Sequence, residues 1–264
     1  MKFTKHGAMR YIGHLDLQRY FQRVNRRAGL KVVYSEGFSP HQKMSFAMPL
    51  SVGYESDGEY FDLELYECPG AERMISLLNE QQTEGISVLS CVLLPDKAEN
   101  AMASVRAADY IITLREGYEA PFDIFKAAED IKDSSSFVIK KAVKKKGRRR
   151  NITPASYNTR SMADGTEECV RKSGSENSSE AAEYKEEDIR PYIFEIRSDG
   201  GRIFLKVSAG SQNNIKPELV ISSLYEKEGF ELPAHVLKIT RGELYTFDAD
   251  RKNLIPLYAA GEVF

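Results

Sequence analysis

Apolar side chains alternate between strand and helix spacing over the first hundred residues, and this alternation restricts the fold more than any other feature. Residues 59–67 place apolar and polar side chains in turn, as a strand with one buried face does. Gly13 ends the first predicted strand. In the next segment the apolar residues recur at helical spacing, at Leu17, Phe21 and Val24. Further strands are predicted over 1–13, 31–35, 43–50 and 86–95, and helices over 14–30 and 70–86. The resulting βαββαβ order predicts a ferredoxin-like domain over residues 1–100, with an antiparallel sheet and two helices on one face.

The same pattern recurs in the second half of the chain. Strands are predicted over 107–114, 135–147, 190–198 and 201–211, and helices over 120–133 and 216–229. Residues 234–247 are interpreted as a final strand pair or hairpin. We therefore predict an α+β protein of two tandem ferredoxin-like domains, the second spanning residues 101–264.

Residues 151–188 interrupt this second pattern. Ser, Glu, Asn, Gly and Ala dominate the segment, and large apolar residues are scarce. Such a segment buries too little apolar surface to offset the conformational entropy that it would lose on folding. We therefore expect a disordered acidic insertion between two strands of the second domain.

The composition argues against several classes of protein. No stretch approaches the roughly 18 to 20 apolar residues of a membrane span, and the first residues lack the apolar run of a secretory signal. Cys68, Cys91 and Cys169 lie too far apart in the sequence for a metal motif. No phosphate-binding glycine loop or nucleophile elbow is found. We expect a cytoplasmic protein without membrane segment, metal or cofactor, and its oligomeric state stays open.

Basic side chains gather in two places. Residues 1–50 hold nine Lys and Arg against two Asp and Glu. Within them, Arg19, Arg23 and Arg26 recur at i, i+4 and i+7 on the predicted helix, about opposite its apolar stripe. A second run, residues 140–150, carries eight cations in eleven positions. Both sets suit a phosphate backbone, although an acidic protein surface would also satisfy them.

Four polar residues form another candidate site. His14 and Asp16 stand at the start of the predicted first helix, and His41 and Lys43 lie in or beside the loop "YSEGFSPHQKMSF", residues 34–46. Two histidines and a carboxylate are able to bind a metal ion or to act as acid and base in phosphodiester cleavage. They are equally able to hold a loop through hydrogen bonds, or to contact RNA. The residues alone leave these alternatives open.

The residues predicted to contact nucleic acid join the basic sets to the aromatic loop. They are Arg10, Arg19, Arg23, Arg26, Arg27, Tyr34, Phe38, His41, Lys43, Lys144, Lys145, Lys146, Arg148, Arg149 and Arg150. In this interpretation the cations neutralise phosphates, while Tyr34, Phe38 and His41 stack on an unpaired base.

The block from "RYIGHLD" to "EYFDLEL", residues 10–65, resembles the start of the radical SAM-associated (radical SAM-linked) protein family, a domain of unknown function. The motifs GHLD, RRAGL, YSEGFSPH and SFAMPL occur in the family's order, and "DIRPYIFEI" and "KPELVISSLYEKEG" resemble later family segments. Gln42 stands where a second proline is common in the family. In that family the domain is encoded beside a cobalamin-binding radical SAM protein or fused to its C-terminus. The resemblance therefore implies a partner that supplies the radical chemistry.

The resemblance and the basic surfaces together predict a non-catalytic accessory protein of a radical SAM enzyme, which binds RNA such as tRNA or rRNA for modification. One alternative is an RNA-processing or RNA-modifying enzyme that uses His14 and His41. Another is a protein-interaction module whose basic surfaces meet an acidic partner without nucleic acid.

Overall fold

The computed structural model describes residues 1–95, 98–142, 184–211, 213–262 and 264. The chain divides into two compact units: Met1–Ile139 with Asp188–Phe264 form the first, and Lys140–Glu187 the second. The first unit contains a nine-stranded mixed sheet, the helices and two apolar cores. The fold belongs to the mixed α+β class, in agreement with the sequence.

The first half of this unit follows the order that the apolar spacing predicts. Its elements are β1 (Lys2–Lys5), α1 (His14–Arg27), β2 (Met44–Phe46), β3 (Glu55–Leu63), α2 (Ala71–Asn79) and β4 (Ile86–Ser90). β1 pairs antiparallel with β3 and β4, and β2 pairs antiparallel with β3. The strands therefore lie in the order β4-β1-β3-β2.

Two predicted strands of this half differ in the structure. The strand expected over 1–13 ends at Lys5, and Gly7–Tyr11 form a 3-10 helix. Gly7 turns the chain with a φ of 58°, a conformation that glycine adopts at little cost, and its N–H donates to Glu55 Oε1. The strand expected over 31–35 is reduced to two isolated bridges, Val32 with Leu65 and Tyr34 with Gln42.

The second half contains α3 (Ala101–Ser104), β5 (Ala107–Leu114), α4 (Ile124–Asp133), β8 (Ile193–Asp199), β9 (Arg202–Ser208), α5 (Pro217–Lys227), β10 (Leu237–Phe247) and β11 (Leu254–Pro256). Its four long strands pair antiparallel in the order β10-β5-β9-β8. Along the chain these four strands come in the order β5, β8, β9 and β10. The sheet order is therefore fourth, first, third, second, as it is for β4-β1-β3-β2 in the first half.

β10 corrects the prediction of a strand pair or hairpin over 234–247. It is one eleven-residue strand with a bulge between Arg241 and Glu243, and the bulge shifts the register without reversing the chain. Gly242 permits it, because a Cβ atom there would lie 2.6 Å from Asp109 Oδ1.

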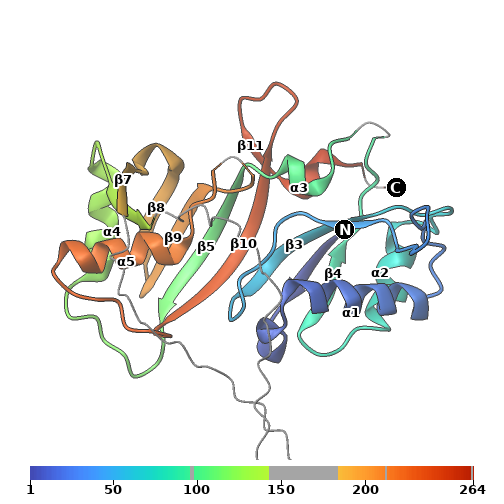
Figure 1. The fold of residues 1–264 in the computed structure, drawn as a ribbon, viewed down its shortest axis with the longest axis horizontal. Coiled ribbons are helices and arrows are strands. Elements are labelled where there is room, and N and C mark those ends of the chain that lie inside the picture. The colour runs from blue at the N-terminus through green and yellow to red at the C-terminus, as the bar shows by residue number, and fades with distance from the viewer. Residues whose placement is uncertain (96–97, 143–183, 212, 263) are drawn as a thin grey trace, which may run out of the picture. The chain divides into compact units, whose positions relative to one another are not determined.

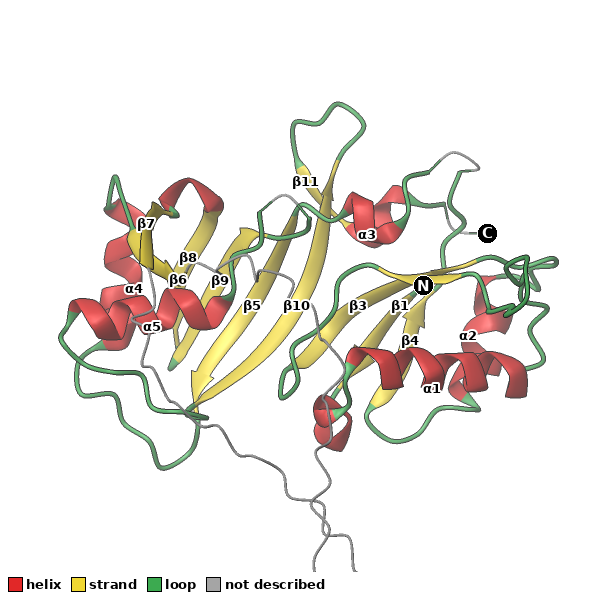
Figure 2. Cartoon of the chain, in the orientation of Figure 1, coloured by secondary structure: helices red, strands yellow, loops and turns green. Residues whose placement is uncertain are grey.

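One pair of strands joins the two halves within the sheet. β10 pairs parallel with β3, where Thr240 lies opposite Glu55 and Arg241 opposite Ser56. Figure 1 shows α1 and α2 beside the β4-β1-β3 part of the sheet, and α4 and α5 beside the β5-β9-β8 part. In Figure 2 the strands of both halves follow one another across the molecule. One apolar core consists of residues from the first 91 positions, and the other is drawn mainly from the second half.

A separate two-stranded sheet pairs β6 (Val138–Ala142) with β7 (Tyr184–Asp188). Residues 184–188, expected as the end of the acidic insertion, are therefore a strand. The rest of that expected insertion, residues 151–183, lies outside the described residues. In the described part of the chain, no helix is both long and apolar enough to span a membrane.

Candidate functional site

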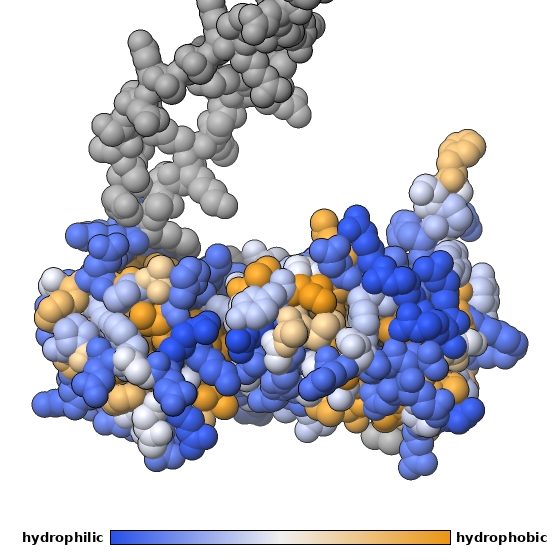
Figure 3. Space-filling model, turned by 90° about the horizontal axis from the view of Figure 1, so that it is seen from below, coloured by the Kyte–Doolittle hydropathy of each residue, from blue (hydrophilic) through white to orange (hydrophobic). Residues whose placement is uncertain are grey.

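α1 places an apolar face inward and an arginine row outward. Its buried residues include Leu17, Phe21 and Val24, and the Phe21 ring lies 4.7 Å from that of Phe61 on β3. Arg19, Arg23 and Arg26 lie on the exposed side, as the spacing predicts. Seen from below in Figure 3, strongly hydrophilic side chains gather at the right, where α1 lies in Figure 1.

Internal contacts separate the arginines into two groups. Arg19 Nη1 pairs with Asp16 Oδ1 at 3.1 Å, and Arg27 Nη2 donates to the Gln81 carbonyl at 2.9 Å. Among the described residues, no acidic side chain pairs with Arg23 or Arg26. These two exposed guanidinium groups are therefore the cations of α1 that retain their full capacity for an anionic ligand.

Hydrogen bonds join the two ends of the loop between Tyr34 and Gln42. Ser35 N donates to the His41 carbonyl at 2.8 Å, His41 N donates to Ser35 Oγ at 3.1 Å, and Ser35 Oγ and His41 Nδ1 lie 2.8 Å apart. His41 thus holds the loop together while its ring stays exposed. Phe38, near the tip, has a relative exposure of 111%, so its ring is not packed against the protein.

Gln42 fastens this loop to α1. Its side chain is buried, Nε2 donates to the Gln22 carbonyl at 3.1 Å, and Oε1 accepts from Asn25 Nδ2 at 3.0 Å. Nε2 also lies 3.4 Å from the Tyr34 hydroxyl. The loop that carries the exposed Phe38 is therefore attached to α1, the helix that carries the arginine row. Asn25 was not among the predicted site residues; its only signal in the sequence is a polar residue on the apolar side of a helix.

The four residues of the predicted polar cluster each have partners of their own. His14 packs edge-on against Phe46, with ring centroids 5.4 Å apart, and Lys43 Nζ lies 3.1 Å from Glu64 Oε2. Asp16 pairs with Arg19, and His41 with Ser35, as described above. No hydrogen bond or ion pair in the described part of the chain joins any two of the four. The described residues also contain no group of three His, Cys, Asp or Glu arranged to hold a metal ion.

The remaining predicted cations fall into two classes. Arg10 Nη1 pairs with Glu55 Oε1 at 3.3 Å, and its Nη2 donates to the Tyr11 hydroxyl at 2.9 Å. Its charge is thus partly committed within the protein. Lys144, Lys145, Lys146, Arg148, Arg149 and Arg150 lie outside the described residues.

A buried ion pair at the junction of the two halves was not predicted from the sequence. Arg241 Nη1 on β10 lies 2.9 and 3.1 Å from the two Glu59 carboxylate oxygens on β3, and both side chains are almost fully buried. The same guanidinium donates to the carbonyls of Met48 and Pro49 at 3.3 Å. The SFAMPL segment, residues 45–50, is therefore held by the strand pair that joins the halves.

Comparison with known families gives one result. A family model described as "Uncharacterized protein conserved in bacteria (DUF2344)" matches residues 1–181, more than half of the chain. The chain belongs to this family. A search of curated proteins finds no match. The matched range of the DUF2344 model includes all of α1, the loop at Phe38 and the SFAMPL segment.

Proposed function

We propose that the protein is a non-catalytic accessory protein that binds RNA and presents it to a cobalamin-binding radical SAM enzyme. The single observation that carries the RNA-binding part is the attachment of a projecting aromatic loop, through Gln42 and Asn25, to the helix whose Arg23 and Arg26 have no acidic partner among the described residues. Cations beside exposed aromatic rings are the combination that single-stranded nucleic acid requires.

We infer different tasks for the predicted residues from their contacts. Arg23 and Arg26 would neutralise phosphates, because neither has an acidic partner among the described residues. Phe38 would stack on an unpaired base, since its ring is exposed on both faces. Arg27 and Lys43, which contact Gln81 and Glu64, would instead support the shape of this surface.

The radical SAM partner is proposed from the resemblance of the GHLD, YSEGFSPH and SFAMPL motifs. The tandem ferredoxin-like architecture is likewise a proposal. It is supported by the strand order β4-β1-β3-β2 of the first half and by its repetition as β10-β5-β9-β8.

The experiment compares binding of a fluorescent single-stranded RNA to the full chain and to the variant Arg23→Glu/Arg26→Glu over a range of salt concentrations. Each lost phosphate contact reduces the magnitude of the negative slope of log K against log salt by about 0.7 for a single strand, so we expect the slope to become less negative by about 1.4. Lys126→Glu/Lys132→Glu on the exposed side of α4 is the matched control, because it makes the same change of charge elsewhere.

An unchanged slope in the α1 variant, or an equal loss in the α4 control, would contradict the proposed RNA surface. The partner is tested separately by purifying the tagged chain from its native cells and identifying both proteins and RNA. Recovery of a radical SAM protein without RNA would leave the accessory role standing and remove the RNA-binding role.

A further inference from the structure

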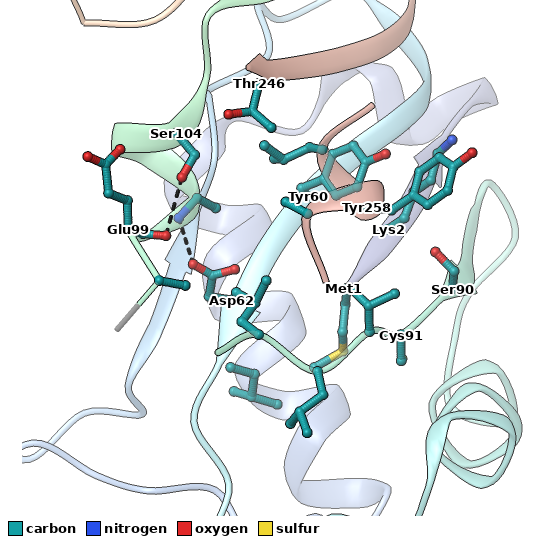
Figure 4. Close-up of a pocket in the computed structure, with 18 of the residues that line it drawn as sticks. Met1, Lys2, Tyr60, Asp62, Ser90, Cys91, Glu99, Ser104, Thr246 and Tyr258 are labelled. Carbon is teal, nitrogen blue, oxygen red and sulfur yellow. Dashed lines mark hydrogen bonds between the residues drawn. The ribbon is translucent and has the colours of Figure 1, made fainter. Parts of the chain in front are cut away.

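A cavity of about 820 Å³ lies beside β3. Tyr60 and Asp62 of β3 line this cavity, and they alternate along the strand with Phe61, whose ring packs on Phe21 of α1. Because successive side chains of a strand point to opposite faces, Tyr60 and Asp62 line the cavity from the face opposite α1, whereas Leu63 and Met74 reach it from the core on the α1 side. α3 and the segment after β10 form its other walls. Figure 4 shows Asp62, Tyr60 and Tyr258 around it.

Apolar side chains contribute about half of the walls and mouth of the cavity, and polar side chains the rest. Leu63, Leu65, Met74 and Leu257 contribute to the walls. Leu93, Phe247, Tyr258 and Phe264 line the cavity while remaining 40–54% exposed. Large apolar side chains that stay exposed around a cavity of this size mark a binding site for a small organic molecule.

Most polar groups of the cavity already have partners inside the protein. Lys2 Nζ pairs with Glu243 Oε2 at 2.7 Å, and the Tyr60 hydroxyl donates to Glu243 Oε1 at 2.6 Å. Ser104 Oγ donates to the Glu99 and Asn100 carbonyls, as Figure 4 shows for Glu99. These groups therefore need no ligand to be satisfied.

Asp62 differs from them. Its Oδ2 accepts the Ala101 N–H at 2.6 Å, but in the described part of the chain nothing donates to Oδ1, and no cation lies within ion-pair distance of the carboxylate. The Met1 ammonium group, which is close enough to act on Asp62 electrostatically, donates to the Phe61 carbonyl instead. Burial raises the pKa of Asp62, as expected for a carboxylate whose charge is not fully compensated.

We propose that this cavity binds a small organic amine, whose apolar body fills the cavity and whose ammonium group donates to Asp62 Oδ1. A cationic donor supplies the partner that a half-buried carboxylate lacks, and a charge-assisted hydrogen bond is stronger than a neutral one. A ligand carboxylate placed beside Asp62 would be repelled by it. This inference does not depend on RNA binding, because no arginine of α1 lines the cavity.

The test uses three indole compounds that differ in one group: tryptamine, tryptophol and indole-3-propionate. The protein contains no tryptophan, so binding of each compound to the full chain is followed directly by the fluorescence of its indole. We expect tryptamine to bind about tenfold more tightly than the alcohol and the acid, the factor that corresponds to a hydrogen bond to a charged group.

Asp62→Asn keeps an oxygen for the Ala101 N–H and should lower the affinity for tryptamine by about tenfold while leaving that for tryptophol unchanged. Asp57→Asn, on the same strand but outside the cavity, is the control and should bind tryptamine as the unaltered chain does. The order of the three affinities is measured on the unaltered chain and therefore needs no variant. The proposal is overturned if the acid binds as tightly as tryptamine, if Asp62→Asn has no effect, or if tryptamine shows no binding up to about 1 mM.

Discussion

The Asn25 amide donates a 3.0 Å hydrogen bond to the side-chain oxygen of Gln42, and this contact joins α1 to the loop that carries Phe38. Gln42→Leu would leave the Asn25 amide buried without its acceptor. A buried polar group in that state costs about 1–3 kcal/mol, so we expect a loss of that size in the free energy of unfolding. RNA affinity should fall as well, because the loop loses its attachment to α1. Urea unfolding and RNA titration measure the two effects.

The double variant Asn25→Leu/Gln42→Leu is the control for this experiment. Replacing both partners leaves neither group of the pair unsatisfied, so the double variant should be more stable than the sum of the single losses implies. RNA affinity would nevertheless stay low, because the attachment is still missing. Strictly additive losses would show that the two side chains act independently.

Phe38→Ala separates binding from stability. Because the ring is not packed against the protein, the free energy of unfolding should change by less than about 0.5 kcal/mol. RNA binding should weaken by about 1–3 kcal/mol, the contribution of one stacked base. Phe194→Ala, which removes an exposed phenylalanine on β8, is the matched control. Equal affinities for the two variants would exclude Phe38 as a stacking residue.

Arg241→Met tests the buried ion pair at the junction of the halves. The substitution leaves the Glu59 carboxylate buried without its guanidinium partner, and breaking such a pair costs about 3–5 kcal/mol. Glu59→Leu/Arg241→Met should recover part of this loss, since no unpaired charge from the pair remains. Unfolding in urea gives both values. A loss below about 1 kcal/mol in the single variant would mean that the pair is not needed to join β3 to β10.

His14 gives the stability a dependence on pH. Burial and the nearby Lys5 ammonium lower the pKa of His14 below its usual value of 6.5. At pH values between the lowered pKa of the folded state and 6.5, the unfolded chain therefore binds more protons than the folded chain. The free energy of unfolding falls as the pH drops below about 6.5. His14→Gln removes this contribution, so the variant should lose less stability between pH 7 and pH 5. Identical pH profiles of unfolding would contradict the lowered pKa.

The sequence predicts the elements better than the contacts between them. Period-two and helical spacing identify α1, α2, β3 and β5 because these elements have one buried and one exposed face. The bulge at Gly242 and the turn at Gly7 depend on tertiary contacts, with Asp109 and Glu55, that no local pattern contains.

For the candidate site, too, local patterns predict the residues but not the contacts between them. The arginine row is visible in the sequence because helix periodicity alone places Arg19, Arg23 and Arg26 on one side. The sequence does not show which of them are paired, since Asp16 and Gln81 become partners only in the fold. Glu59 and Arg241 are 182 residues apart, so their contact leaves no local signal.

The parallel pairing of β3 with β10 also has a consequence for synthesis of the chain. The start of β3, at Glu55 and Ser56, pairs with residues 240–241 of β10, which leave the ribosome long after β1, β2 and β4. Until then this stretch of strand has unpaired backbone groups on that edge, the kind of surface that recruits other chains into mixed sheets. Shortened forms of the protein that end before β10 should therefore associate with themselves, and completion of the last long strand protects the first half as well as the second.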